Sequence, residues 1–213
     1  MNERALKGVV VDAGHGGSDP GAISGNVYEK DFTLRAAKYI YDRLTQLGIP
    51  AVLTRDSDTS LPKNERIQKV LDFYGADDDV IVVSNHINAG GGEGAEVVYA
   101  LRNDPTLANL VLDNIGDAGQ IKRKVYQRRL PENPNKDYYY IIRETTPTEA
   151  ILVEYGFIDN TLSPDGDPLD ILVLTSEPTF PGCVMDAKII GVLKTVDNGF
   201  EDNKIISVNY VDP

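Results

Sequence analysis

Short apolar runs alternate with amphipathic helical stretches through the first 160 residues of this 213-residue chain. The apolar runs are rich in branched aliphatic side chains and cover residues 8–11, 50–55, 80–86, 95–100 and 150–157. Helical spacing of apolar residues marks the segments 29–47, 62–74 and 105–118. Strands that alternate with helices predict an α/β fold, with a largely parallel, twisted sheet flanked by helices.

The pattern changes after Asn160. Residues 161–213 contain β-rich segments separated by Pro, Gly, Asn and Asp, and no amphipathic helix stands among them. This tail carries nine Asp and Glu against three Lys, with no Arg or His. We therefore predict an α/β domain at residues 1–160 and a separate β-rich tail at residues 161–213.

The charge and composition exclude several classes of partner. A net charge of −12 argues against nucleic acid and against docking on anionic lipid, because both need clustered Lys and Arg. No apolar run is long enough to span a membrane, and the first residues, MNERALKGVVVDAG, contain no signal peptide. The single cysteine excludes an internal disulfide.

The chain has only two histidines, and both follow predicted strands. His15 lies in VVVDAGHGG and His86 ends VIVVSNH, so both belong at the carboxyl ends of parallel strands, where ligands bind. Glu29 begins the first helix, and Glu154 ends a further strand. Two histidines and one carboxylate are typical of a catalytic zinc site, which His15, Glu29 and His86 would form.

This reading assigns Glu154 a separate role. Zinc lowers the pKa of its bound water to about 7, and Glu154 would act as general base and then as general acid in the hydrolysis of an amide. A structural reading stays open for each residue alone. A strand-end histidine can simply be hydrogen-bonded, and a glutamate at a helix start can complement the helix dipole.

Four separated blocks carry a family resemblance: DAGHGGSDPGA, GNVYEKDFTL, SNHINA and ILVEYGFIDN. In this order they resemble the zinc-dependent N-acetylmuramoyl-L-alanine amidases of bacterial cell-wall turnover and phage lysis, over about residues 7–160. The resemblance implies metal ligands at His15, Glu29 and His86 and a catalytic Glu154. It implies peptidoglycan as the substrate, and action at the cell wall as an endolysin or autolysin.

Two further positions follow from this resemblance. The region near Arg143 borders the family's substrate groove, so Arg143 is a predicted substrate-binding residue, and Tyr138 to Tyr140 could stack on sugar or peptide. The alternative for these tyrosines is a β-strand with one buried face. Asn85 departs from the family pattern, which has an apolar residue there, and this affects strand packing rather than the ligand set.

The tail resembles a different family. Residues 155–211, from YGFIDN to KIISV, are similar to the middle of soluble inorganic pyrophosphatases. That resemblance implies a partial β-barrel fold for the tail. It also implies Mg²⁺-binding aspartates, with Lys204 and Tyr155 at further active-site positions. The aspartates are Asp165, Asp167, Asp170, Asp197 and Asp202. For the first three, an acidic turn is the alternative.

Because the tail lacks the family's other cationic residues, we expect no useful pyrophosphatase activity, and weak Mg²⁺ binding stays open. Two alternatives to the amidase remain: a magnesium-dependent phosphohydrolase, or a catalytically disabled chimeric or wall-binding protein. The tail could also support self-association. A recombination or an engineered splice between the two patterns would explain their junction.

Overall fold

A computed structural model describes residues 6–24, 27–88, 94–118 and 120–156, together with five short strands of the tail. No helix within these residues is long and apolar enough to cross a membrane.

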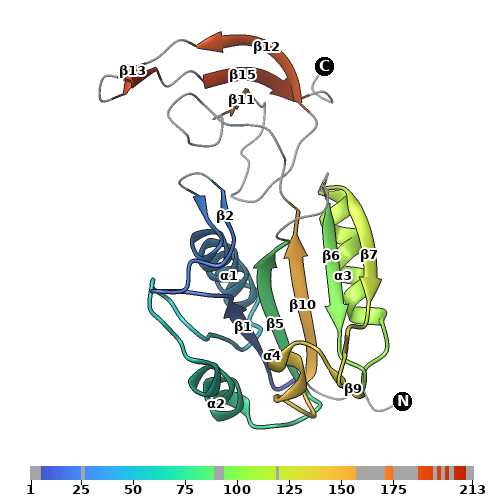
Figure 1. The fold of residues 1–213 in the computed structure, drawn as a ribbon. Coiled ribbons are helices and arrows are strands. Elements are labelled where there is room, and N and C mark those ends of the chain that lie inside the picture. The colour runs from blue at the N-terminus through green and yellow to red at the C-terminus, as the bar shows by residue number, and fades with distance from the viewer. Residues whose placement is uncertain are drawn as a thin grey trace.

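A six-stranded sheet forms the centre of the first 156 residues (Figure 1). Its strand order is β4-β1-β5-β10-β6-β7. The four strands β4, β1, β5 and β10 are parallel, whereas β6 pairs with β10 in the antiparallel direction and β7 runs parallel to β6. The bounds are Gly8–Ala13 for β1, Ala51–Leu53 for β4, Val80–Ile87 for β5, Ala95–Tyr99 for β6, Lys122–Tyr126 for β7 and Glu149–Tyr155 for β10. The predicted largely parallel sheet is thus confirmed.

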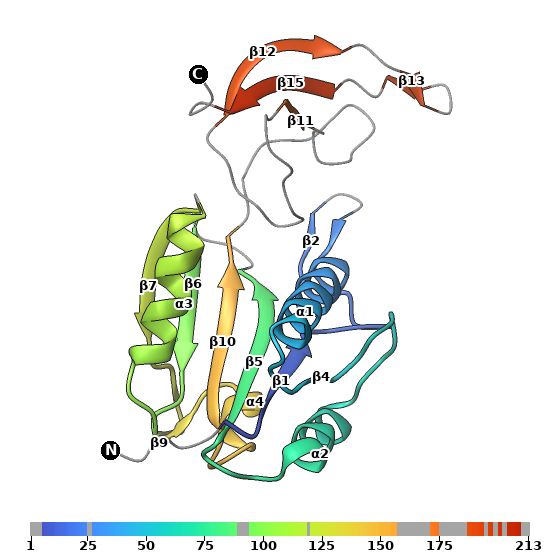
Figure 2. The same cartoon turned by 180° about the vertical axis from the view of Figure 1, so that it is seen from behind.

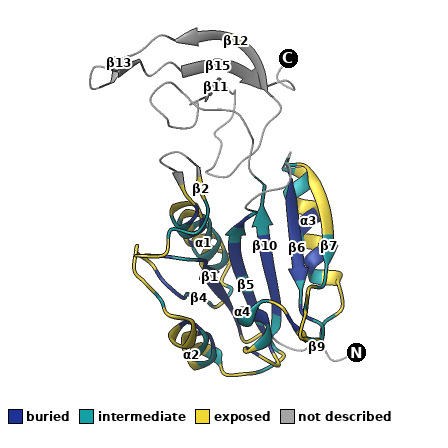
Figure 3. Ribbon diagram, in the orientation of Figure 1, coloured by how far each residue is buried: buried dark blue, intermediate teal, exposed yellow. Residues whose placement is uncertain are grey.

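Helices cover both faces of the sheet (Figures 1 and 2). Helices α1 (Glu29–Gln46) and α3 (Thr106–Asp117) lie on one face, and α2 (Lys63–Tyr74) and α4 (Tyr140–Arg143) lie on the other. Successive strand residues point to opposite faces. Val10 therefore packs with the α2 and α4 side, while Val9 and Val11 pack with the α1 side. Figure 3 shows that the central strands are the most buried part of this region.

Two short hairpins complete this region. Strands β2 (Ile23–Ser24) and β3 (Val27–Tyr28) lead directly into α1, and strands β8 (Arg129–Leu130) and β9 (Asn133–Asp137) precede α4. The strand interpretation of the tyrosine run is wrong, because Tyr140 already begins α4 and Tyr139 is its extended N-cap residue.

The described tail residues are strand-rich, as predicted. Strands β11 (Ile171–Leu174), β15 (Lys204–Asn209) and β12 (Ala187–Leu193) form a three-stranded sheet, and β13 (Val196–Asp197) pairs with β14 (Phe200–Glu201).

Candidate metal centre

The site lies where three neighbouring parallel strands end. Strands β1, β5 and β10 are adjacent, so their carboxyl ends meet at one end of the sheet. Residues two apart along a strand share a face. His86 and its register partner Glu154 consequently point to the same face, the one covered by α2 and α4. His15 follows β1 by two residues.

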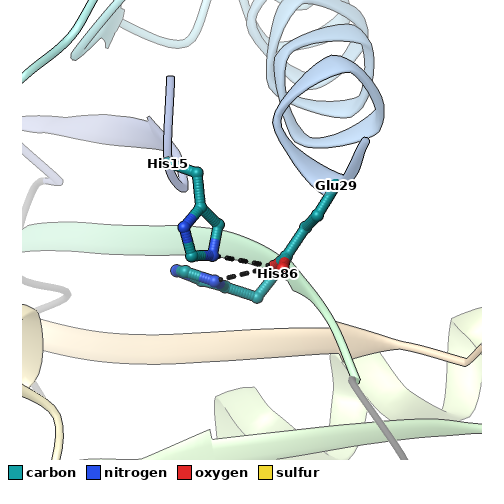
Figure 4. A group of neighbouring side chains, drawn as sticks. All are labelled: His15, Glu29 and His86. Atoms are coloured by element: carbon teal, nitrogen blue, oxygen red, sulfur yellow. Dashed lines mark hydrogen bonds and ion pairs between the residues drawn. The ribbon is translucent and has the colours of Figure 1, made fainter. Parts of the chain in front are cut away.

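His15, Glu29 and His86 come together in one group, as Figure 4 shows. The Glu29 carboxylate oxygen Oε1 lies 3.1 Å from His15 Nε2 and 3.0 Å from His86 Nδ1. One ligand atom from each of the three residues lies within 4.8 Å of the other two. The two histidines keep some exposure, at 24% and 21% of their side-chain surface, while Glu29 keeps 4%. The group is therefore reachable from solvent through its histidines.

Backbone N–H groups fix the carboxylate of Glu29. Ile87 donates to Oε1 at 2.9 Å, and Ala22 donates to Oε2 at 2.8 Å. Burial would raise the pKa of Glu29, but hydrogen bonds from His15 and His86 and these N–H groups hold the pKa well below its ordinary value. The carboxylate is therefore charged and oriented, which suits a divalent cation.

Asp19 orients the ring of His15. Its Oδ2 lies 2.9 Å from His15 Nδ1, while Nε2 faces Glu29. Burial would lower the pKa of His15, but Glu29 and Asp19 together raise the pKa above its ordinary value. A carboxylate behind a ligating histidine selects the ring tautomer with a free Nε2. Two imidazoles and one carboxylate fit zinc by donor type and by spacing.

Glu154 stands beside this group. It is the register partner of His86 on β5 and of Glu96 on β6. The Tyr139 hydroxyl donates a hydrogen bond to Glu154 Oε1 at 3.5 Å. Burial is the main cause that raises the pKa of Glu154, and the nearby Glu29 and Glu96 add to it. A carboxyl group with a raised pKa is suited to exchange protons.

A cavity of about 440 Å³ borders the metal group. Its lining includes His15, His86, Arg66, Tyr139 and Tyr140. Sequence reasoning considered the tyrosines as stacking platforms or as the buried face of a strand, and it did not single out Arg66. No local sequence pattern marks Arg66 or the tyrosines as residues of this site, because they reach it from elements that pack against the sheet.

Arg143 lies elsewhere. Its Nη1 donates to the carbonyls of Asp137 and Tyr138, at 2.6 and 2.7 Å, and it lines a different cavity, with none of the residues of the metal group. The cation nearer to Glu154 is Arg128, which donates to the Tyr139 hydroxyl at 3.0 Å and stacks 3.9 Å from the Tyr138 ring centre. The substrate-binding role of Arg143 stays a prediction.

Asn85 has a clear structural function. It is fully buried, its Nδ2 donates to the Asp12 carbonyl at 2.9 Å, and its Oδ1 accepts from the Tyr155 hydroxyl at 3.0 Å. The polar residue thus joins β1, β5 and β10 near the site, and the candidate ligands His15, Glu29 and His86 remain together.

The Mg²⁺-binding role of the tail aspartates stays a prediction. Asp165, Asp167, Asp170 and Asp202 lie outside the described residues, and Asp197 is placed only as part of the backbone of β13.

The tail matches inorganic pyrophosphatases. The sequence profile of that family matches residues 121–213. Over 60 residues the chain is 62% identical to the enzymes of Halalkalibacterium halodurans and Geobacillus stearothermophilus. The match covers 28% of this chain and 37% and 36% of those proteins, so the chain spans little more than a third of their length. The tail is thus similar to a fragment of a pyrophosphatase.

The larger part of the chain matches several solved structures. Cwp6 from Clostridium difficile is 34% identical with a TM-score of 0.62, over 70% of this chain and 24% of Cwp6. The catalytic domain of CwlV, an N-acetylmuramoyl-L-alanine amidase from Bacillus (Paenibacillus) polymyxa, is 31% identical with a TM-score of 0.58, over 70% of this chain and 79% of that one.

A third solved structure agrees. The amidase AmiC2 of Nostoc punctiforme is 30% identical with a TM-score of 0.60, over 74% of this chain and 86% of that one. The profile of the N-acetylmuramoyl-L-alanine amidase family matches residues 9–164, which include all four residues of the candidate site. This chain therefore belongs to the N-acetylmuramoyl-L-alanine amidase family.

Proposed function

We propose that the chain hydrolyses the amide bond between the lactyl group of N-acetylmuramic acid and L-alanine in peptidoglycan, with zinc held by His15, Glu29 and His86. One observation carries this proposal. Three ligands suited to zinc meet at the carboxyl ends of parallel strands, and Glu154 is the register partner of one of them. Membership of the amidase family supports the choice of substrate.

The reaction needs a base and an acid, and in this proposal Glu154 serves as both. When bound, zinc would polarise the amide carbonyl and the attacking water. Glu154 takes one proton from that water and later gives it to the leaving nitrogen. The lactyl carbonyl becomes a carboxylic acid, and L-alanine gains a free amino group. The Tyr139 hydroxyl helps to orient the Glu154 carboxylate during both transfers.

Purified protein incubated with peptidoglycan sacculi tests this proposal. We expect new L-alanine amino termini, detected by labelling of amines, and about one zinc ion per chain by elemental analysis. His86→Ala should lose both the zinc and the activity. New reducing sugar ends in place of amino termini, or full activity after complete removal of the metal, would contradict the proposal.

A further inference from the structure

We propose that two buried arginines, Arg55 and Arg66, are positioning residues that set the geometry of the metal ligand His15. They do so by binding the backbone carbonyls of residues 13–15, the segment that carries His15 away from β1. This inference rests on the proposed metal centre, and it concerns how the protein holds that centre before the metal binds.

Arg66 reaches this segment from α2. Its side chain is 4% exposed. One nitrogen, Nη1, donates to the Asp12 carboxylate and to the Ala13 carbonyl, both at 2.6 Å. The other, Nη2, donates to the carbonyl of His15 itself at 2.7 Å. A single planar guanidinium thus spans the end of β1 and the metal ligand.

Arg55 approaches from the other side, after β4. Its Nε donates to the Ala13 carbonyl at 3.1 Å, and its Nη2 donates to the Gly14 carbonyl at 2.9 Å. The same Nη2 also donates to the carbonyl of Lys30 at 2.8 Å. Lys30 follows Glu29 in the first turn of α1. Arg55 therefore fastens the His15 segment to the helix that carries the second metal ligand.

The backbone at His15 needs such support. Its φ angle is 60°, in the left-handed region that residues with a Cβ rarely adopt. In this conformation the ring of His15 faces Glu29, and Arg66 binds the backbone carbonyl of the same residue. Strained backbone of this kind persists where its surroundings hold it in place.

The fork shape of arginine is what this role requires. Arg66 binds carbonyls two residues apart through two different nitrogens, and lysine offers only one. Arg66→Lys keeps a positive charge beside the buried Asp12 but loses one of the two hydrogen bonds to backbone carbonyls. The substitution therefore separates charge compensation from positioning.

Arg102 provides a matched control. It is less buried than Arg55 and Arg66, but it likewise binds backbone carbonyls, through Nε to Thr148 at 2.9 Å and through Nη1 to Ile142 at 2.8 Å. Within the described part of the chain, it forms no hydrogen bond with any of the three candidate metal ligands. Arg102→Lys should therefore disturb the fold to a comparable degree without changing the metal group.

The experiment measures zinc affinity of the metal-free full chain by competition with a chromogenic chelator. The absorption spectrum of bound Co²⁺ provides a second readout, of ligand geometry. We expect Arg66→Lys to bind zinc about 10- to 100-fold more weakly, the range typical for groups that orient metal ligands, and to change the Co²⁺ spectrum. Arg102→Lys should match the wild type in both. Circular dichroism and thermal melting confirm that each variant is folded.

Each outcome decides the question. If the wild type binds no zinc, the proposed metal centre itself fails, which is distinct from a failure of this inference. If the wild type binds zinc and Arg66→Lys is unchanged, or if Arg102→Lys weakens binding equally, the inference is overturned. Should Arg66→Lys not fold, Arg55→Lys decides by the same two readouts. If neither variant folds, the arginines serve the whole fold, and the specific positioning role is rejected.

Discussion

Glu154 and Glu96 are register partners on one face of the sheet, and their contacts give them different roles. Glu96 is 3% exposed and forms an ion pair with Arg123 at 2.8 Å. For Glu154, the described residues show no ion pair with Lys or Arg, and its partner is the Tyr139 hydroxyl. The charge of Glu96 is thus used within the fold, whereas that of Glu154 is available for proton transfer.

We therefore expect Glu154→Gln to lower kcat for peptidoglycan by about 10²- to 10⁴-fold, the usual contribution of a general acid–base group. Its zinc content should stay at the wild-type level, because Glu154 is not a ligand in this proposal. Glu96→Gln, the matched control, should keep kcat within about tenfold of the wild type. Amino-terminus release and elemental analysis measure both. Equal losses of kcat in Glu154→Gln and Glu96→Gln would contradict a special role of Glu154 in proton transfer.

Asp12 gives a prediction about pH. Burial alone would raise the pKa of Asp12, but the Arg66 guanidinium and hydrogen bonds from Ser84 and Thr54 hold it below its ordinary value. A carboxyl group whose pKa is lowered by folding stabilises the protein above its unfolded pKa, about 3.9 for Asp. That contribution is lost as the pH falls through the lower folded pKa.

Asp12→Asn should lower the free energy of unfolding at pH 7 by about 3–5 kcal/mol, because it leaves Arg66 buried without its anion. The difference from the wild type should shrink below about pH 4, where the wild type also begins to lose its charged pair. Urea unfolding at pH 7 and pH 3 measures this change. Asp58→Asn, which removes a partly exposed partner of Lys30, should have a much smaller effect. If the difference in free energy of unfolding between the wild type and Asp12→Asn grew at low pH, this explanation would be contradicted.

The sequence predicted the ligands better than their supports. His15 and His86 are the chain's two histidines and lie at the carboxyl ends of apolar strands, and a parallel sheet brings such positions together. Arg66 is buried because Asp12 and the His15 carbonyl accept its hydrogen bonds, and no spacing rule for α2 contains that information. Tyr139 reaches Glu154 from the N-cap of α4, a helix of four residues that periodicity cannot detect.

At the scale of elements, the turn between β1 and α1 is packed closely against the metal group. A Cβ built on Gly21, which has a φ of 68°, would lie 2.6 Å from Glu29 Oε2 and 2.7 Å from His15 Cδ2. Gly48, at the end of α1, has a similar φ of 75°, but nothing lies within 4 Å of its Cβ position. The two positions share a left-handed backbone that alanine adopts at a cost, and they differ in the clash.

Gly21→Ala should therefore weaken zinc binding by about tenfold or more, because the methyl group would displace two ligands. Gly48→Ala should leave the zinc affinity unchanged and cost about 1–2 kcal/mol of stability from its left-handed backbone. Chelator competition and urea unfolding separate the two effects. Wild-type zinc affinity in Gly21→Ala would show that the turn can move away from the ligands.

The five apolar runs were predicted correctly as strands, but strand directions were not all available from the sequence. The run at 95–100 is as apolar as the others, yet β6 is antiparallel to β10. Apolar content reports burial and not direction. Strand β7 was missed because its five residues include three exposed ones and carry Lys122 and Lys124, as suits an edge strand.

At the scale of the whole molecule, the two family patterns overlap along the chain. The amidase profile matches residues 9–164 and the pyrophosphatase profile matches residues 121–213. Tyr155 fits both patterns in the sequence, but in the structure it ends β10 and donates to Asn85 within the amidase sheet. The boundary near residue 160 stays a prediction, because residues 157–170 lie outside the described part of the chain.

The last prediction concerns the activity that the tail alone would suggest. The chain spans little more than a third of the pyrophosphatases it matches, and residues 161–213 provide three lysines and no arginine. Pyrophosphate carries several negative charges, and its hydrolysis needs cationic side chains in addition to metal ions. We therefore expect no phosphate release from pyrophosphate with Mg²⁺ above the rate without protein.

A phosphate assay on the full chain measures this, with Asp167→Asn as the control. Activity that is equal in both proteins would come from a contaminating enzyme and would leave the prediction intact. Activity in the wild type that Asp167→Asn abolishes would instead show that 53 residues can assemble a working phosphohydrolase site. In that case the missing cations would have to come from the amidase part of the chain or from a second copy, and the protein would carry two enzymes rather than one.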